Sequence, residues 1–228
     1  MQHPVTTPVS ITQPPFARLC QAALLIGRVN TFYQKYRVNK SCRLEDVDVL
    51  ADEHVALLQA VDADPGSASV HADRLSLLAA RSLARSSLFM LLDPFCGPEG
   101  ILDGLASGSG SSYGSTQSPD QLRLHARADQ LMDDLSYQAR REVTELLGAG
   151  PPTAPGHVSP FILDVVYRAV GVFHCNWRED GDEVARPAID DMVECLKTMS
   201  GRWGLASEYL TLERYHGMAD SGQLGVET

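Results

Sequence analysis

The spacing of apolar residues constrains this chain more than any other feature, because it repeats every three or four positions along almost the whole length. That period is typical of amphipathic α-helices, whereas a half-buried strand alternates with a period of two. The sequence shows no sustained alternation with period two. The pattern therefore predicts an all-α fold, a single irregular bundle of about six to seven helices.

Two of the predicted helices differ in how their apolar residues are distributed. In the first, which runs from Phe16 to about Arg37, the spacing predicts a buried stripe; its members are Leu19, Ala23, Ile26, Val29 and Tyr33. The third, at residues 70–92, is apolar on most sides around small residues such as Ala80 and Ala84. A helix of that kind is expected at the centre of a bundle.

Two later helices carry recognisable start signals. Ser118, Pro119 and Gln121 have the spacing of an N-cap, a first-turn proline and the second half of a capping box. Ser159 followed by Pro160 repeats the start of that signal. We therefore expect helices to begin at these two points, with Gly148 ending the first of them.

Composition divides the chain into one helical domain with irregular segments around and within it. Residues 1–14 are expected to form a disordered polar tail, and 217–228 a second one. The helical domain spans 15–216. Within it we predict a flexible Gly/Ser-rich loop at 98–117, which includes the stretch GLASGSGSSYGSTQ, and a proline-rich loop at 149–157.

Composition and charge exclude several classes of function. Hydrophobic residues make up 44% of the 228 residues and the net charge is −10, which is typical of a globular protein and unfavourable for direct nucleic-acid binding. Arg81, Arg85 and the Arg140–Arg141 pair are interpreted as charges on helix surfaces. No apolar run approaches the roughly 18 residues of a membrane span, and no secretory signal is visible at the start. We expect an intracellular protein with no membrane contact.

The five cysteines are Cys20, Cys42, Cys96, Cys175 and Cys195. Their number is odd and none forms a C-x-x-C pair, so they predict neither a disulfide framework nor a zinc site. We interpret them as reduced, buried thiols.

Two short motifs could carry chemistry, and both are better explained without it. The serine-hydrolase pattern G-x-S-x-G at 110–114 lies in the Gly/Ser loop, whereas a nucleophile elbow needs a strand before it and a helix after it. Asp190, Asp191 and Glu194 resemble the magnesium-binding motif of class I terpene synthases, but a second metal motif does not follow downstream. We interpret them as acids early in a helix, where the helix dipole favours them. The sequence therefore predicts no catalytic residues, no metal and no cofactor.

One group of side chains has the make-up of a small-molecule site. Tyr167, His174 and Trp177 follow one another on a single predicted helix and could line an apolar cavity that has a few polar groups. The alternative is a core histidine beside ordinary aromatic packing. Both interpretations remain open from sequence.

Four blocks of the sequence resemble the regulatory region of fungal zinc binuclear-cluster transcription factors. They are LCQAALLIGRV at 19–29, the apolar segment at 81–96 that ends in Asp-Pro-Phe-Cys, the segment at 158–169, and GRWGLASEYL at 201–210. The resemblance implies a helical domain that modulates transcription, in some cases by sensing a metabolite. It adds Trp203 to the candidate ligand-binding residues, and it implies a nuclear location, with the cytoplasm as the alternative.

The cysteine cluster that binds DNA in that family has no counterpart here, so direct DNA binding is not expected. The implied partners are a small-molecule effector and either a second copy of the chain or a partner transcription factor. The alternative is a stand-alone helical protein of a fungal secondary-metabolite pathway. It would bind a small hydrophobic molecule and act as a cyclase or isomerase without a metal.

Overall fold

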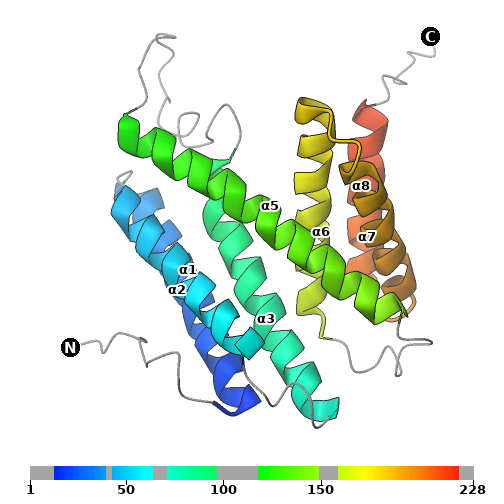
Figure 1. The fold of residues 1–228 in the computed structure, drawn as a ribbon, viewed down its shortest axis with the longest axis horizontal. Helices are drawn as coiled ribbons and strands as arrows, with labels where there is room; N and C mark the ends of the chain where they lie inside the picture. Colours follow the sequence, from blue (N-terminus) through cyan, green and yellow to red (C-terminus); the bar gives the residue numbers. More distant parts are fainter. Residues whose placement is uncertain (1–12, 40–42, 64–70, 97–117, 149–158, 221–228) are drawn as a thin grey trace. The chain divides into compact units, whose positions relative to one another are not determined.

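The computed structural model describes residues 13–39, 43–63, 71–96, 118–148 and 159–220. These residues are almost entirely helical, and they contain no strand (Figure 1). The predicted all-α fold is therefore confirmed. The chain divides into two compact units, residues 1–135 and 136–228.

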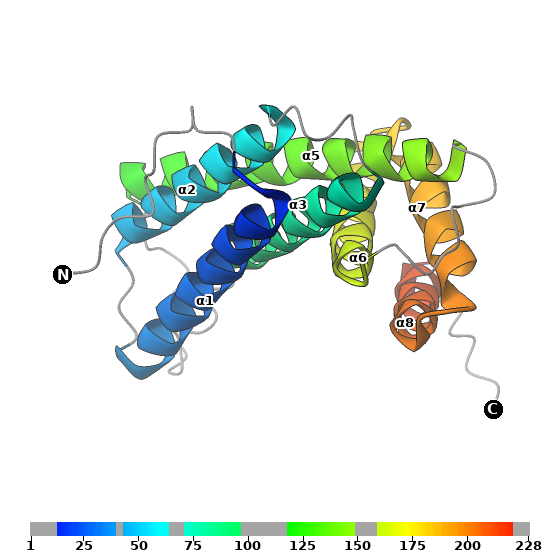
Figure 2. The same ribbon diagram turned by 90° about the horizontal axis from the view of Figure 1, so that it is seen from below.

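Unit 1 is built from three consecutive helices and the first part of a longer one. The elements are α1 (Pro15–Asn39), α2 (Leu44–Ala63), α3 (His71–Leu92), the short 3-10 helix η2 (Asp93–Phe95), and α5 (Pro119–Gly148) as far as Leu135. α1 and α2 both pack against α3 and against each other (Figure 2).

The third helix lies at the centre of unit 1, as its sequence predicts. Leu88, Phe89, Leu91 and Leu92 are fully buried, as are the small residues Ala80 and Ala84. Small side chains on a buried helix allow its neighbours to approach closely. η2 continues this core, because Phe95 is also buried.

The first helix forms as predicted, but its buried face is rotated from the expected one. Arg18, Ala22, Leu25 and Val29 are buried, whereas Ala23 is exposed. Leu19, Ile26 and Tyr33 are half-buried. α1 has apolar residues on more than one side, so its periodicity leaves two faces to choose from, and packing against α3 decides between them.

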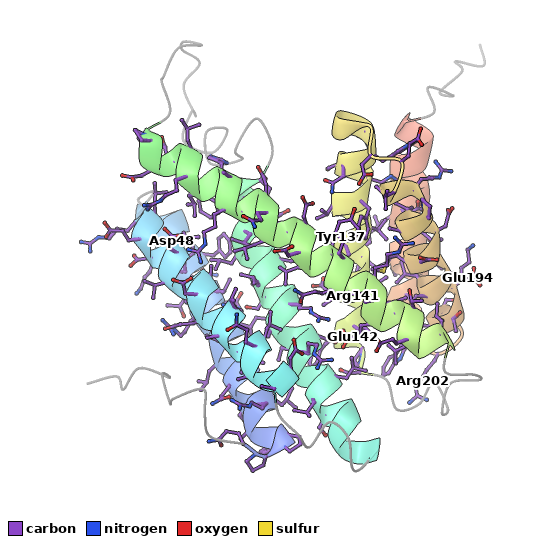
Figure 3. All side chains as sticks on the ribbon, viewed as in Figure 1. Asp48, Tyr137, Arg141, Glu142, Glu194 and Arg202 are labelled. Carbon is purple, nitrogen blue, oxygen red and sulfur yellow. The ribbon has the colours of Figure 1, made fainter. Side chains whose placement is uncertain are left out.

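Unit 2 consists of the second part of α5 and three further helices. These are α6 (Phe161–Cys175) with its π-helical extension η4 (Asn176–Asp180), α7 (Ala185–Ser200) and α8 (Gly204–Asp220). α7 packs against both α6 and α8. Tyr137 of α5, which is labelled in Figure 3, stacks edge-on against the buried Phe173 of α6 and donates a hydrogen bond to Asp182.

The start and stop signals are borne out to different degrees. Ser118 and Gln121 form the predicted capping box: the Ser118 amide donates to Oε1 of Gln121 at 2.7 Å, and the Gln121 amide donates to Oγ of Ser118 at 3.2 Å. At the second site α6 begins at Phe161, whose amide lies 3.4 Å from Oγ of Ser159. Gly181 ends η4 with a φ of 67°, a left-handed conformation that favours glycine.

Two expectations about burial are wrong. Cys20 and Cys175 are exposed, Cys96 is half-buried, and only Cys195 of the four described cysteines is fully buried. Cys20 lies on α1 opposite the face that packs against α3. Arg85, expected on a surface, is buried because α3 is enclosed on most sides.

Several predicted segments lie outside the described residues, namely 1–12, 98–117 with its G-x-S-x-G pattern, 149–157, 221–228 and Cys42. The last helix is longer than predicted, because α8 extends to Asp220 and includes the first residues of the predicted tail. Within the described ranges, no helix has the length and apolar character needed to cross a membrane.

The capping box gives the first testable prediction. We expect Ser118→Ala to lower the free energy of unfolding by about 1 kcal/mol, because it removes an N-cap that satisfies an amide at the start of α5. Ser159→Ala is the matched control, since within the described ranges the contact of its hydroxyl is the long one at 3.4 Å. Urea denaturation of both variants measures the difference; equal effects would contradict the assignment.

Candidate functional site

The clearest cluster of chemically capable side chains lies where α6 and α8 meet in unit 2. Tyr167 of α6 and Tyr209 of α8 stack with ring centroids 4.4 Å apart and planes within 7° of parallel. We call the surrounding group the α6–α8 seam; its members are Asp164, Tyr167, Arg168 and His174 of α6 and Tyr209 and Glu213 of α8.

The sequence of α6 places these residues on one side by helical spacing. Ile162, Val166, Ala169, Val170 and Phe173 are buried on the apolar side of the helix. Tyr167 and Arg168 lie three and four positions after Asp164, and His174 lies seven after Tyr167, so the seam residues of α6 share the other side. Within the seam, Tyr209 contacts residues early in α6 and Glu213 contacts His174 later in it, so the two helices run in the same direction.

Asp164 organises one end of the seam through both of its carboxylate oxygens. Oδ2 accepts a hydrogen bond from Nε of Arg168 at 2.8 Å, one helical turn away. Oδ1 accepts a hydrogen bond from the Tyr209 hydroxyl at 3.2 Å. Burial, and then the negative charge of Asp164, raise the pKa of Tyr209 to about 12. Tyr209 is therefore a neutral hydrogen-bond donor at physiological pH.

His174 and Glu213 occupy the other end. Nε2 of His174 lies 3.4 Å from Oε1 of Glu213, and both side chains are mostly buried, with exposed fractions of 13% and 18%. A carboxylate oxygen can only accept, so this contact places a proton on Nε2. Nδ1 is buried and has no hydrogen-bond partner in the described part of the chain. In the neutral ring Nδ1 is an acceptor, so a hydrogen bond there requires a donor.

Together these side chains offer an aromatic stack flanked by a carboxylate–arginine pair and by a histidine–carboxylate pair. Aromatic surface with a few convergent polar groups is the usual make-up of a small-molecule site. A histidine oriented by a carboxylate can also transfer protons. The seam therefore has the residue types of a small-molecule site, and it holds groups that can take part in acid–base chemistry.

Two of the four predicted ligand-binding residues belong to the seam, and two do not. Tyr167 and His174 lie in it, as described. Trp177 lies in η4 beyond the end of α6, half-covered by the guanidinium of Arg186 at 5.0 Å from its ring. Trp203 precedes the first turn of α8, and Arg202 lies 5.2 Å from its ring. Because α6 and α8 run in the same direction, the two tryptophans lie at opposite ends of the seam.

Four seam residues were not found from the sequence. Asp164 and Arg168 had a local signal, the i,i+4 spacing of an acid and a base on one helix. Tyr209 and Glu213 had none, because their role depends on α8 packing beside α6, more than 30 residues away in the sequence.

The acidic motif of α7 has a structural explanation. Asp191 accepts a charged hydrogen bond from Nε of Arg140 at 2.9 Å, and Glu194 lies 3.4 Å from Lys197; Glu194 is labelled in Figure 3. α7 begins at Ala185, so these acids lie beyond the first turn, and pairing with basic residues rather than the helix dipole accounts for them. The described residues contain no group of three or more potential ligands placed to hold a metal ion.

A buried serine–histidine pair in unit 1 resembles a nucleophile and its base, but its surroundings are those of a structural contact. His54 is fully buried; Nδ1 lies 2.6 Å from the carbonyl oxygen of Leu50, and Nε2 lies 2.9 Å from Oγ of Ser87. A carbonyl can only accept, so Nδ1 carries the proton and Ser87 donates to Nε2. Both ring nitrogens are thereby satisfied, and the pair links α2 to α3.

The thiols of Cys96 and Cys195 are equally unsuited to nucleophilic attack. Burial raises the pKa of Cys195 to about 12, and burial together with the negative charge of Asp129 raises the pKa of Cys96. Because the thiolate is the reactive form, both cysteines are inert at neutral pH.

None of the protein-family models, curated proteins or solved structures compared with this chain matches it. The interpretation of the seam therefore rests on its own geometry.

Burial lowers the pKa of His54 below its ordinary value of about 6.5, which gives a second prediction. At pH values between 6.5 and the lower pKa of the folded state, the unfolded chain binds a proton at His54 that the folded chain does not. The contribution of the neutral His54 side chain to the free energy of unfolding is therefore fully present above pH 6.5. It decreases as the pH falls below 6.5, by at most about 1.4 kcal/mol per pH unit.

The measurement compares the wild type with the double variant His54→Leu/Ser87→Ala, which removes the titrating group and its partner together. Urea denaturation at pH 8 gives the packing cost of the substitutions. The free energy of unfolding of the wild type, taken relative to that of the variant, should then decrease from pH 8 towards pH 5. A difference that stays constant with pH would contradict the buried neutral imidazole.

Proposed function

We propose that this chain is a regulatory, effector-sensing domain of a fungal transcription regulator. In this role it modulates transcription by binding and does not itself contact DNA. The support from sequence is the resemblance at 19–29, 81–96, 158–169 and 201–210. The first two blocks contribute described residues to the core of unit 1. The described residues of the last two blocks lie at the start of α6 and at or just before the start of α8, the helices that form the α6–α8 seam.

The observation that carries the effector-sensing part is the buried Nδ1 of His174, which has no partner among the described residues. Leaving a buried polar atom without a hydrogen bond costs free energy, so such an atom in a native structure calls for an explanation. A bound molecule that donates a hydrogen bond to Nδ1 and lies against the Tyr167–Tyr209 pair would supply one. The proposed effector is thus a small, largely apolar metabolite that carries a hydroxyl group.

The binding test is thermal denaturation of the full chain against a panel of hydroxylated aromatic and aliphatic metabolites. A true ligand at a hundredfold excess over its dissociation constant should raise the melting temperature by roughly 5–10 °C. We expect His174→Ala and Tyr209→Phe to abolish or weaken this shift. Tyr33→Phe is the matched control, because it removes a tyrosine hydroxyl that hydrogen-bonds Met90 in unit 1. Flat melting curves across the panel would count against an effector site.

The regulatory test is a reporter assay in yeast. The chain is fused between a heterologous DNA-binding domain and an activation domain, and reporter output is measured with and without the ligand identified above. We expect the ligand to change the output of the wild-type fusion at least severalfold and to leave that of the His174→Ala fusion unchanged. Ligand binding without any change in output would refute the regulatory role and leave the site in place.

A second candidate follows from the His174–Glu213 pair. These groups could move protons on a bound hydrophobic substrate, as in a cyclase or isomerase that needs no metal. In that case a metabolite that binds the wild type would be converted to an isomeric product, and His174→Gln would remove turnover while retaining part of the binding. Product analysis by mass spectrometry and NMR distinguishes this outcome from simple sensing.

A further inference from the structure

Each compact unit contains a largely buried histidine, and the two imidazole rings have opposite surroundings. In unit 2, His174 lies 3.4 Å from the carboxylate of Glu213, which can pair with a protonated ring. In unit 1, His54 is fully buried, and its partners in the described part of the chain are the Leu50 carbonyl and the Ser87 hydroxyl. Both of these partners are uncharged, so neither balances a positive charge on the ring.

The helices that pack against α2 bring no balancing charge to His54 among the residues that the structure describes. From α1, Arg28 acts on the ring with a like charge, and Arg28 is itself paired with Glu53. On α3, Arg85 precedes Ser87 by two positions, which places it on the opposite side of that helix. A proton added to the His54 ring would therefore create a buried charge beside another positive one, which is unfavourable.

Helix α5 also contacts α2 through charged groups, but away from the His54 ring. Arg127 pairs with Asp48 and Asp52, which precede His54 by six and two positions. At about 100° per residue, these two acids lie on other sides of α2. They are already neutralised by arginine and hold α5 to α2 whether or not the ring is charged.

We propose that His54 is an acid-sensitive latch: protonation of its ring releases α2 from α3 within unit 1, while unit 2 stays closed. In the neutral ring Nδ1 carries the proton and the Ser87 hydroxyl donates to Nε2, so Nε2 is where an added proton must go. Protonation therefore ends the hydrogen bond that Ser87 donates. Opening the contact between α2 and α3 admits water to the charged ring, so acid favours the open form.

The electrostatics of the closed form support this direction. Burial lowers the pKa of His54 most, the hydrogen bond to the Leu50 carbonyl offsets part of that effect, and the positive charge of Arg28 lowers the pKa further. The exposed ring of the open form has its ordinary pKa of about 6.5. Between these two values the open form binds a proton that the closed form does not, so its population rises as the pH falls below 6.5.

Release of α2 would change which surface unit 1 presents. In the closed form α2 buries an apolar side that includes Leu50, Leu57 and Val61. Apolar surface of this kind is a mark of an interaction site when it becomes accessible. The latch would thus make access to this surface depend on pH.

Hydrogen exchange of the full chain, measured by mass spectrometry at about pH 7.5 and about pH 5.5, tests the latch. The intrinsic exchange rate at each pH is divided by the measured rate of each peptide, so that this protection factor reports the opening equilibrium. An opening that exposes His54 becomes more frequent by up to about tenfold per pH unit below 6.5. We expect the protection of α2 to fall severalfold at the lower pH and that of α6 and α7 to be retained.

Two variants separate the latch from a general loss of stability. In His54→Leu/Ser87→Ala, which lacks the titrating ring, the protection of α2 should be the same at both pH values. Tyr33→Phe is the matched control, because it loses a hydrogen bond to the Met90 carbonyl of α3 but no group that titrates in this range. It should lower the protection in unit 1 and keep the pH effect on α2.

An NMR titration of the His54 ring in the wild type is a readout that needs no variant. Protonation of this ring should coincide with the loss of α2 protection. Three results would overturn the proposal: protection of α2 that changes no more than that of α6 and α7, a pH effect that persists in the double variant, or a His54 ring that titrates while α2 stays protected.

Discussion

Burial of α3 is the constraint on which unit 1 depends. This helix is apolar on most sides, so it is stable only when neighbours cover it, and α1 and α2 both pack against it. Burying one leucine or phenylalanine side chain is favourable by roughly 1.5–3 kcal/mol, and α3 buries a row of them. The positions of α1 and α2 follow from the need to enclose it.

Enclosing α3 also determines where polar groups can lie. His54 of α2 and Ser87 of α3 meet in this core, and their hydrogen bonds satisfy each other and a backbone carbonyl. On the far side of α1, the residues that do not reach α3 remain exposed, and these include Phe16 and Leu24. Which residues of α1 are exposed thus follows from the face that packs against α3.

Unit 2 has a different distribution of polar groups. α6 buries an apolar side and turns a polar, aromatic side towards α8, where tyrosines stack and carboxylates pair with arginine and histidine. Because polar groups in a low-dielectric interior need partners, a satisfied network of this kind fixes how the two helices align. Among the described residues of the seam, Nδ1 of His174 is buried without a hydrogen-bond partner, and the proposed effector site rests on that atom.

The sequence by itself determined the helical fold, the central place of α3, the capping box at Ser118 and the end of α5 at Gly148, because each depends on residues a few positions apart. It also indicated Tyr167 and His174. The tertiary structure alone decided which face of α1 is buried, why Cys20 is exposed and Arg85 is not, and that Tyr209 and Glu213 complete the seam. These features depend on contacts between helices distant in sequence, and helical periodicity carries no information about which helix a given face will meet.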